Sequence, residues 1–136
     1  MGCMFRVLVT SEDAGGSYTT MEATVPPEEG ANPHFHADEE ERFYVLDGEL
    51  TFEVDGQTIE VGTGDLLHVP RGVVHSFRNG DREAKLLATL RPRHRDRAGF
   101  YRHGNTHDRR GGVRIRPRPA ATRCLPPPRR VTFSQR

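Results

Sequence analysis

Three histidines and one glutamate in this chain of 136 residues have the side chains of a transition-metal site. His34 and His36 are separated by one residue, Glu41 follows closely, and His75 comes about forty residues later. Neutral imidazole and carboxylate groups bind divalent Fe, Mn, Co, Ni, Cu and Zn. We therefore predict a divalent transition-metal cofactor, with His34, His36, Glu41 and His75 as ligands and with the identity of the metal left open.

These side chains converge only if the surrounding elements are β-strands of suitable register. Residues two apart in a strand point to the same face, so His34 and His36 can reach one metal from a single strand. Glu41 lies five residues beyond His36, and this change of parity requires a turn or bulge, for which residues 37–40 are the natural place. From these parities we expect an interior site shared by two neighbouring strand segments.

The rest of the first ninety residues follows an all-β pattern. Asp55-Gly56 between two alternating runs is a strong signal for a two-residue hairpin. No helical period of useful length occurs before residue 90. Many short strands at regular spacing favour a sandwich or barrel, in which closure hides the strand edges. The expected strands cover residues 5–9, 18–25, 42–46, 50–54, 57–61, 66–69, 74–78 and 85–90.

Two spaced patterns around these residues resemble the motifs of the cupin superfamily. The first is His34-x-His36-x4-Glu41-x6-Gly48, and the second is Gly64-x5-Pro70-x-Gly72-x2-His75-x3-Asn79. The first cupin motif usually opens with a glycine six residues before its first histidine, where this chain has Glu28. The resemblance covers residues 5–90 and implies a jelly-roll β-barrel of the cupin type. Through residues 43–50 the chain looks most like the small quercetin-dioxygenase-like cupins.

The resemblance also carries expectations about assembly and activity. It implies a homodimer that buries an outer sheet face, for which Leu66 and His68 are candidates. It implies a small-molecule substrate and, as first hypothesis, metal-dependent dioxygenase-like oxidation of a small oxygenated or aromatic compound. Isomerisation, cyclisation or decarboxylation by Lewis-acid chemistry is the alternative enzymatic hypothesis. A non-catalytic module that binds a small ligand or a metal is the third.

Glu41 is the candidate catalytic residue, because a carboxylate can accept a proton from a substrate hydroxyl as well as bind metal. Its neighbours Glu39 and Glu40 are rivals, but only Glu41 stands seven residues before Gly48. Three phenylalanines of the expected strands fit the hydrophobic core better than a substrate pocket: Phe43, Phe52 and Phe77.

The C-terminal part of the chain differs in composition, so we divide it into a barrel domain, residues 1–92, and a tail, residues 93–136. Residues 1–90 contain six Lys plus Arg against seventeen Asp plus Glu, whereas residues 91–136 contain fourteen Arg, no Lys and two Asp. Such an Arg- and Pro-rich tail is expected to be disordered, apart from a short piece near residues 98–101. It could bind a polyanion, fold back on the acidic barrel, or result from a shifted reading frame.

Neither a membrane-spanning run nor a signal peptide is evident in the sequence. We accordingly expect a cytoplasmic protein that binds no membrane. Nucleic acid is not the expected partner, although the basic tail leaves it open.

Overall fold

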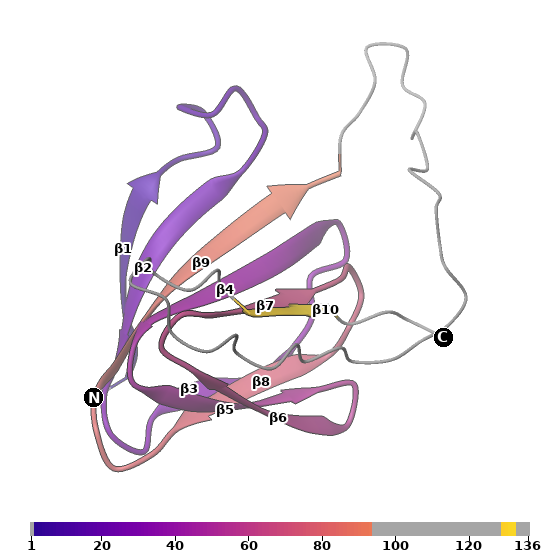
Figure 1. Cartoon of the computed structure of the whole chain (residues 1–136). Coiled ribbons are helices and arrows are strands. Elements are labelled where there is room, and N and C mark those ends of the chain that lie inside the picture. Colours follow the sequence, from indigo (N-terminus) through magenta and orange to yellow (C-terminus); the bar gives the residue numbers. More distant parts are fainter. Residues whose placement is uncertain (1, 94–128, 133–136) are drawn as a thin grey trace, which may run out of the picture.

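The computed structural model describes residues 2–93 and 129–132, which form two β-sheets packed face to face and contain no helix (Figure 1). The six-stranded sheet has the order β1-β2-β9-β4-β7-β10, and the four-stranded sheet has the order β3-β8-β5-β6. The strands are β1 (Met4–Val9), β2 (Thr19–Val25), β3 (Gly30–His34), β4 (Glu39–Asp47), β5 (Glu49–Val54), β6 (Gln57–Gly62), β7 (Asp65–Val69), β8 (His75–Asn79), β9 (Ala84–Pro92) and β10 (Arg129–Thr132).

The core lies between the two sheets and follows from the alternation of apolar residues along the strands. In β5, Leu50, Phe52 and Val54 are buried while the intervening residues face outward. The same alternation in β8 adds buried side chains from this sheet, and that in β4 and β9 adds buried side chains from the opposite sheet. The predicted all-β, cupin-type architecture is therefore confirmed.

The predicted hairpin at Asp55-Gly56 is present between β5 and β6. Both residues have positive φ angles, 50° and 75°, as a tight two-residue turn between twisted strands requires. The strand pairing that follows runs without a register shift from Val54 and Gln57 to Glu49 and Gly62. Here local sequence alone is enough to specify the structure.

Two elements depart from the sequence expectations. Strand β3 was not among the expected runs, because Pro33 and Asn32 are poor strand formers; its pairing with β8 produces it. Within the tail, Arg129–Thr132 form β10, which pairs in parallel with β7. The expectation of a tail disordered apart from a piece near residues 98–101 does not hold for these four residues, because an open strand edge offers backbone groups that can pair with almost any sequence.

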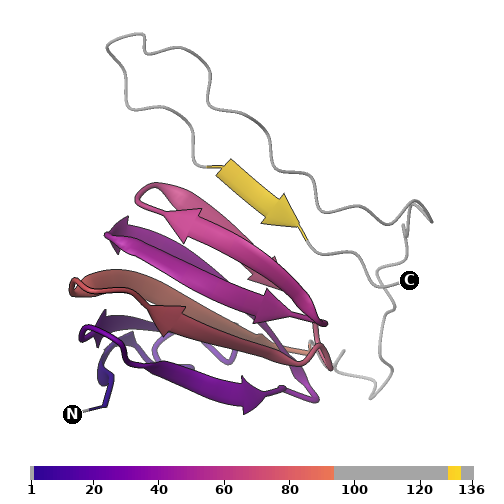
Figure 2. The ribbon, with the colours of Figure 1, turned by 90° about the horizontal axis from the view of Figure 1, so that it is seen from below.

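Figure 2 shows the four-stranded sheet from below, with β10 beyond its β6 side. The remaining expectations for the tail, including a short piece near residues 98–101, concern residues outside those the structure describes. Among the described residues, no helix is long and apolar enough to cross a membrane.

Candidate metal centre

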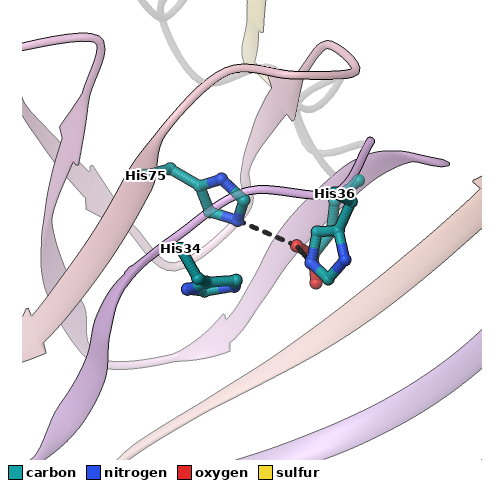
Figure 3. A group of neighbouring side chains, drawn as sticks. His34, His36 and His75 are labelled. Atoms are coloured by element: carbon teal, nitrogen blue, oxygen red, sulfur yellow. Dashed lines mark hydrogen bonds and ion pairs between the residues drawn. The ribbon is translucent and has the colours of Figure 1, made fainter. Parts of the chain in front are cut away.

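The strand register brings His34 and His75 together. They are directly paired residues of the antiparallel strands β3 and β8, and their ring centroids lie 4.3 Å apart (Figure 3). Glu41 comes from β4 in the opposite sheet, where it pairs with Leu90 of β9 and Val69 of β7. The group therefore spans the space between the two sheets at one end of the sandwich.

His36 reaches the same point from outside a strand, so its predicted strand position is wrong. Strand β3 ends at His34, and residues 35–38 form the β3–β4 connection, whose bend at residues 37 and 38 supplies the predicted change of parity. The backbone amide of Gly72 donates a 2.9 Å hydrogen bond to the carbonyl oxygen of His36. This bond fixes His36 against the β7–β8 connection, residues 70–74, which leads to His75.

Backbone carbonyl groups orient two of the imidazole rings. Nδ1 of His75 lies 3.0 Å from the carbonyl oxygen of Val73, and Nδ1 of His34 lies 2.7 Å from that of Asn32. With the Nδ1 proton donated to a carbonyl, the neutral ring presents the lone pair of Nε2. Both rings are therefore held with Nδ1 turned to the backbone and Nε2 turned away from it, and for His75 this Nε2 faces Glu41.

The carboxylate of Glu41 stands beside two of these nitrogens. Its Oε2 atom is 3.0 Å from Nε2 of His75 and 3.2 Å from Nε2 of His36. Burial lowers the pKa of His75, but hydrogen bonds to Glu41 and to the Val73 carbonyl outweigh this effect and raise it. The space between imidazole and carboxylate thus attracts positive charge, which a proton or a metal ion can supply.

The dimensions of the group fit one metal ion. One ligand atom from each of His34, His36, Glu41 and His75 lies within 4.8 Å of all the others. Two ligands at roughly 2.1 Å from one ion are at most about 4.2 Å apart, so only a small contraction is needed. Nε2 of His36 is buried and makes no well-aligned hydrogen bond among the described residues, although Oε2 of Glu41 lies 3.2 Å away, so a cation between the two atoms would satisfy both.

The interior behind this group is filled by aromatic side chains. Phe43, Phe52 and Phe77 are buried, with ring centroids 5.0 to 6.0 Å apart, and Phe43 also stands 5.9 Å from the ring of His75. The interpretation of these residues as core is confirmed. His34 and His36 are only partly buried, whereas Glu41 and His75 are buried, so the group is exposed to solvent on the side of His34 and His36.

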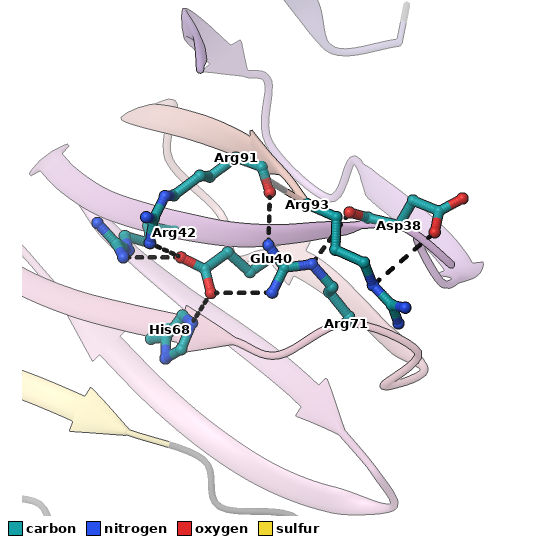
Figure 4. A network of polar contacts seen from close by, with 7 residues as sticks. All are labelled: Asp38, Glu40, Arg42, His68, Arg71, Arg91 and Arg93. Atoms are coloured by element: carbon teal, nitrogen blue, oxygen red, sulfur yellow. Dashed lines mark hydrogen bonds and ion pairs between the residues drawn. The ribbon is translucent and has the colours of Figure 1, made fainter. Parts of the chain in front are cut away.

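The acidic neighbours of Glu41 point elsewhere. Glu39 is half-exposed, and its nearest carboxylate oxygen is 3.8 Å from Nδ1 of His36, on the far side of the ring. Glu40 lies on the outer face of the six-stranded sheet, where it contacts arginines and His68 (Figure 4). Glu41 is therefore the carboxylate that joins the three histidines.

The network around Glu40 was not foreseen from the sequence, because its members come from four segments. Burial raises the pKa of Glu40, but the surrounding cations outweigh it and hold the pKa below its usual range. In this network Glu40 contacts Arg42 at 2.8 Å, Arg91 at 3.3 Å, and Arg71 and His68 at 3.6 Å each.

Residues 21–90 match the family model described as the cupin domain. The chain belongs to the cupin family. It is 32% identical over 89 residues to quercetin 2,3-dioxygenase of Bacillus subtilis, covering 65% of this chain but 26% of that protein. It is 35% identical over 89 residues to polyketide synthase CurC of Streptomyces cyaneus, covering 64% of this chain and 58% of the relative. This cupin therefore spans less than two thirds of the length of these relatives.

A solved structure from Thermotoga maritima, described as a predicted oxalate decarboxylase, has a similar fold. It aligns with a TM-score of 0.64 at 25% identity and covers 66% of this chain and 80% of that one. This likeness agrees with the two-sheet architecture described above.

The glycine and asparagine of the two cupin motifs, Gly48 and Asn79, have structural roles in this cupin. Gly48 has a φ of 89°, and a Cβ atom there would stand 2.8 Å from Cβ of Ala84. Asn79 is buried, and its Nδ2 donates to the carbonyl oxygen of Val25 at 2.8 Å. At the position of the missing first glycine, Glu28 itself has a φ of 61°. The backbone at residue 28 is therefore left-handed even though the residue there is glutamate and not glycine, which adopts this conformation most easily.

Proposed function

We propose that this cupin binds a divalent transition metal through His34, His36, Glu41 and His75 and acts as a metal-dependent, dioxygenase-like oxidoreductase. Its substrate would be a small oxygenated molecule, with aromatic compounds as the first class to test. The observation that supports the metal-binding part is the convergence of four ligand atoms, one from each of these side chains, within 4.8 Å of one another.

The residues of the site have separable roles under this proposal. A bound transition ion supplies Lewis acidity to substrate oxygen atoms and, when it is redox active, a route for electrons between an organic substrate and dioxygen. His34 and His75 are held in place by carbonyl oxygens, so they act as fixed ligands. Oε2 of Glu41 is the acceptor placed to take a proton from a substrate hydroxyl that enters beside His36.

The relatives support oxidation as the first candidate. The Bacillus protein that matches over 89 residues is named as a quercetin 2,3-dioxygenase, and so is a relative from Aspergillus japonicus that is 28% identical over 96 residues. Since the chain covers about a quarter of each, the substrate of those proteins does not transfer directly. A cytoplasmic location and a small-molecule partner form part of the proposal.

A second candidate is isomerisation, cyclisation or decarboxylation without dioxygen. The likeness to the Thermotoga protein, described as a predicted oxalate decarboxylase, favours it. The same Glu41 carboxylate would then serve as proton acceptor or donor while the metal polarises a carbonyl group. A non-catalytic ligand-binding role is the remaining alternative.

The test combines metal analysis with a search for turnover. The purified protein is loaded separately with Fe, Mn, Co, Ni, Cu and Zn, and oxygen uptake is recorded with flavonols, simpler phenols and enols, with the His36→Ala variant as control. We expect uptake with a redox-active metal that the variant lacks. Binding of Zn alone without oxygen uptake would exclude the dioxygenase proposal. Turnover under anaerobic conditions would support the second candidate, and ligand-induced stabilisation without turnover the third.

We also propose a homodimer, formed through β1. Among the described residues, this strand is one of the two edges of the six-stranded sheet, and its apolar side chains are exposed on both faces: Met4 65%, Phe5 56%, Val7 55% and Leu8 44%. Since a large side chain presents roughly 150–250 Å², about 400 Å² of apolar surface is exposed per copy. A standard interface buries about 800 Å² per partner, a little over half of it apolar. A second copy paired along β1 would supply such an interface and remove an aggregation-prone edge.

A further inference from the structure

Arg71 lies in the β7–β8 connection, four residues before His75, and its guanidinium group reaches across to other segments. Its Nε atom donates a 3.0 Å hydrogen bond to the carbonyl oxygen of Asp38, and Nη2 lies 3.4 Å from that of Arg91. Its Nη1 is 3.6 Å from a carboxylate oxygen of Glu40 (Figure 4). One side chain thus contacts the β3–β4 connection, the start of β4 and the end of β9.

Those contacts are made beside the candidate metal ligands. Asp38 is two residues after His36, and Glu40 immediately precedes Glu41. The residue after Arg71 adds a backbone link, since the amide of Gly72 donates to the carbonyl oxygen of His36. Through Arg71 and Gly72, the β7–β8 connection that leads to His75 is therefore bonded to the β3–β4 connection and to the start of β4, which carry His36 and Glu41.

We propose that Arg71 is a positioning residue of the metal centre. By holding the β3–β4 connection against the β7–β8 connection, it sets the distance of His36 and Glu41 from His75. This inference rests on the metal-binding function proposed above. Arginine suits the task because its planar group presents several donors in a fixed arrangement, which lysine cannot reproduce.

Arg42 provides a matched control from the same network. Its Nη2 atom is 2.8 Å from Glu40, closer than Arg71, and its side chain is 44% exposed against 27% for Arg71. Arg42 belongs to β4 itself, two residues from Glu40, and within the described part of the chain its side-chain hydrogen bond goes to this carboxylate and not to either connection. Replacing either arginine removes one positive charge from the same carboxylate, but only replacement of Arg71 separates the two connections.

The experiment compares full-length Arg71→Met and Arg42→Met proteins with the wild type. In the metal-free proteins, hydrogen exchange of the Gly72 amide reports how firmly the connections are joined. In the loaded proteins, chelator competition gives the dissociation constant for Co(II), and the visible spectrum of Co(II) reports its geometry. For Arg71→Met we expect Gly72 exchange faster by about tenfold or more and Co(II) affinity lower by about 10–100-fold, the usual cost of losing a residue that supports ligands.

Arg42→Met should leave the Gly72 exchange rate and the affinity within about twofold of the wild type. Arg71→Lys keeps the charge and is the folded substitute if Arg71→Met does not fold; we expect it to stay weakened in both measurements. Wild-type affinity and Gly72 exchange in both Arg71 variants would overturn the inference while leaving the metal site in place. If the wild type binds no divalent metal, the metal proposal is wrong. In that case Arg71 has no metal centre to position, and the Gly72 exchange rate of Arg71→Met relative to the wild type still decides whether Arg71 holds the two connections together.

Discussion

Replacing His36 by alanine tests the metal site more sharply than replacing any of its partners. The Nε2 atom of His36 makes no hydrogen bond among the described residues, and its side chain is 28% exposed. Removing it should therefore cost the metal-free protein about 1 kcal/mol or less. His75 is a poorer probe, because it is buried and hydrogen-bonded to Val73 and Glu41, so its loss would also damage the apo fold.

The expected effect appears when metal is added. At a metal concentration about one hundred times the dissociation constant, binding stabilises the native protein by about 2.7 kcal/mol. In a domain of this size that corresponds to a rise in Tm of roughly 10–20 °C. If the loss of His36 weakens binding by about 100-fold, the same concentration stabilises by about 0.4 kcal/mol, or roughly 2–3 °C.

His68→Ala is the control for this measurement. His68 is also a partly exposed histidine, 26% against 28%, and its Nε2 atom likewise lacks a hydrogen-bond partner among the described residues. It stands on the outer face of the sheet, near Glu40 and away from the candidate ligands. Thermal unfolding with and without Co(II) or Mn(II) should show the full rise in Tm for His68→Ala and almost none for His36→Ala. A full rise in His36→Ala would refute the assignment of the site.

Four further predictions follow from other features. Glu41→Gln keeps the shape of the side chain without its charge, so Co(II) binding should weaken but remain measurable, while turnover falls by about 100-fold or more; unchanged kcat would rule out a proton-accepting role. Glu28→Gly should stabilise the protein by about 0.5 kcal/mol, because a left-handed backbone is costly for a residue with a Cβ atom. When both variants are unfolded with urea, Asp55→Gly should gain less free energy of unfolding than Glu28→Gly, since aspartate tolerates the left-handed conformation. Burial lowers the pKa of His68, although a neighbouring carboxylate acts the other way, so the unfolded chain binds the proton more readily. The stability that His68 contributes is then complete above its ordinary pKa and is lost as pH falls. Between about pH 7.5 and pH 5.5, the urea midpoint should therefore decrease less in His68→Gln than in the wild type. Phe5→Glu should convert a dimer to a monomer in sedimentation velocity, and a monomeric wild type at high concentration would contradict pairing through β1.

The parts of this protein that local sequence determines were predictable. The Asp55-Gly56 turn depends on two adjacent residues that tolerate positive φ, and the structure shows both in that conformation. The convergence of His34, His75 and Glu41 could be inferred because strand parity and motif spacing limit where such side chains point. Both inferences need only neighbouring residues and the period of a strand.

The remainder depends on contacts between distant segments. Strand β3 contains Pro33 and exists because β8 lies beside it, so propensity alone could not reveal it. His36 lies beyond the strand end, and its place depends on the Gly72 amide. Arg71 gave no signal at all, since its partners are carbonyl oxygens and a carboxylate from three other segments.

Strand β8 is fastened to the opposite sheet at both ends, but by different chemistry. At its last residue, the Asn79 amide binds the Val25 carbonyl oxygen of β2, a neutral hydrogen bond that does not depend on pH or metal. At its first residue, Nε2 of His75 lies 3.0 Å from Oε2 of Glu41 of β4, a hydrogen bond between two ionisable groups that a bound metal ion would replace under our proposal. The contact at the Asn79 end of β8 therefore stays the same in all conditions, whereas the contact at the His75 end changes in strength with protonation and with metal binding.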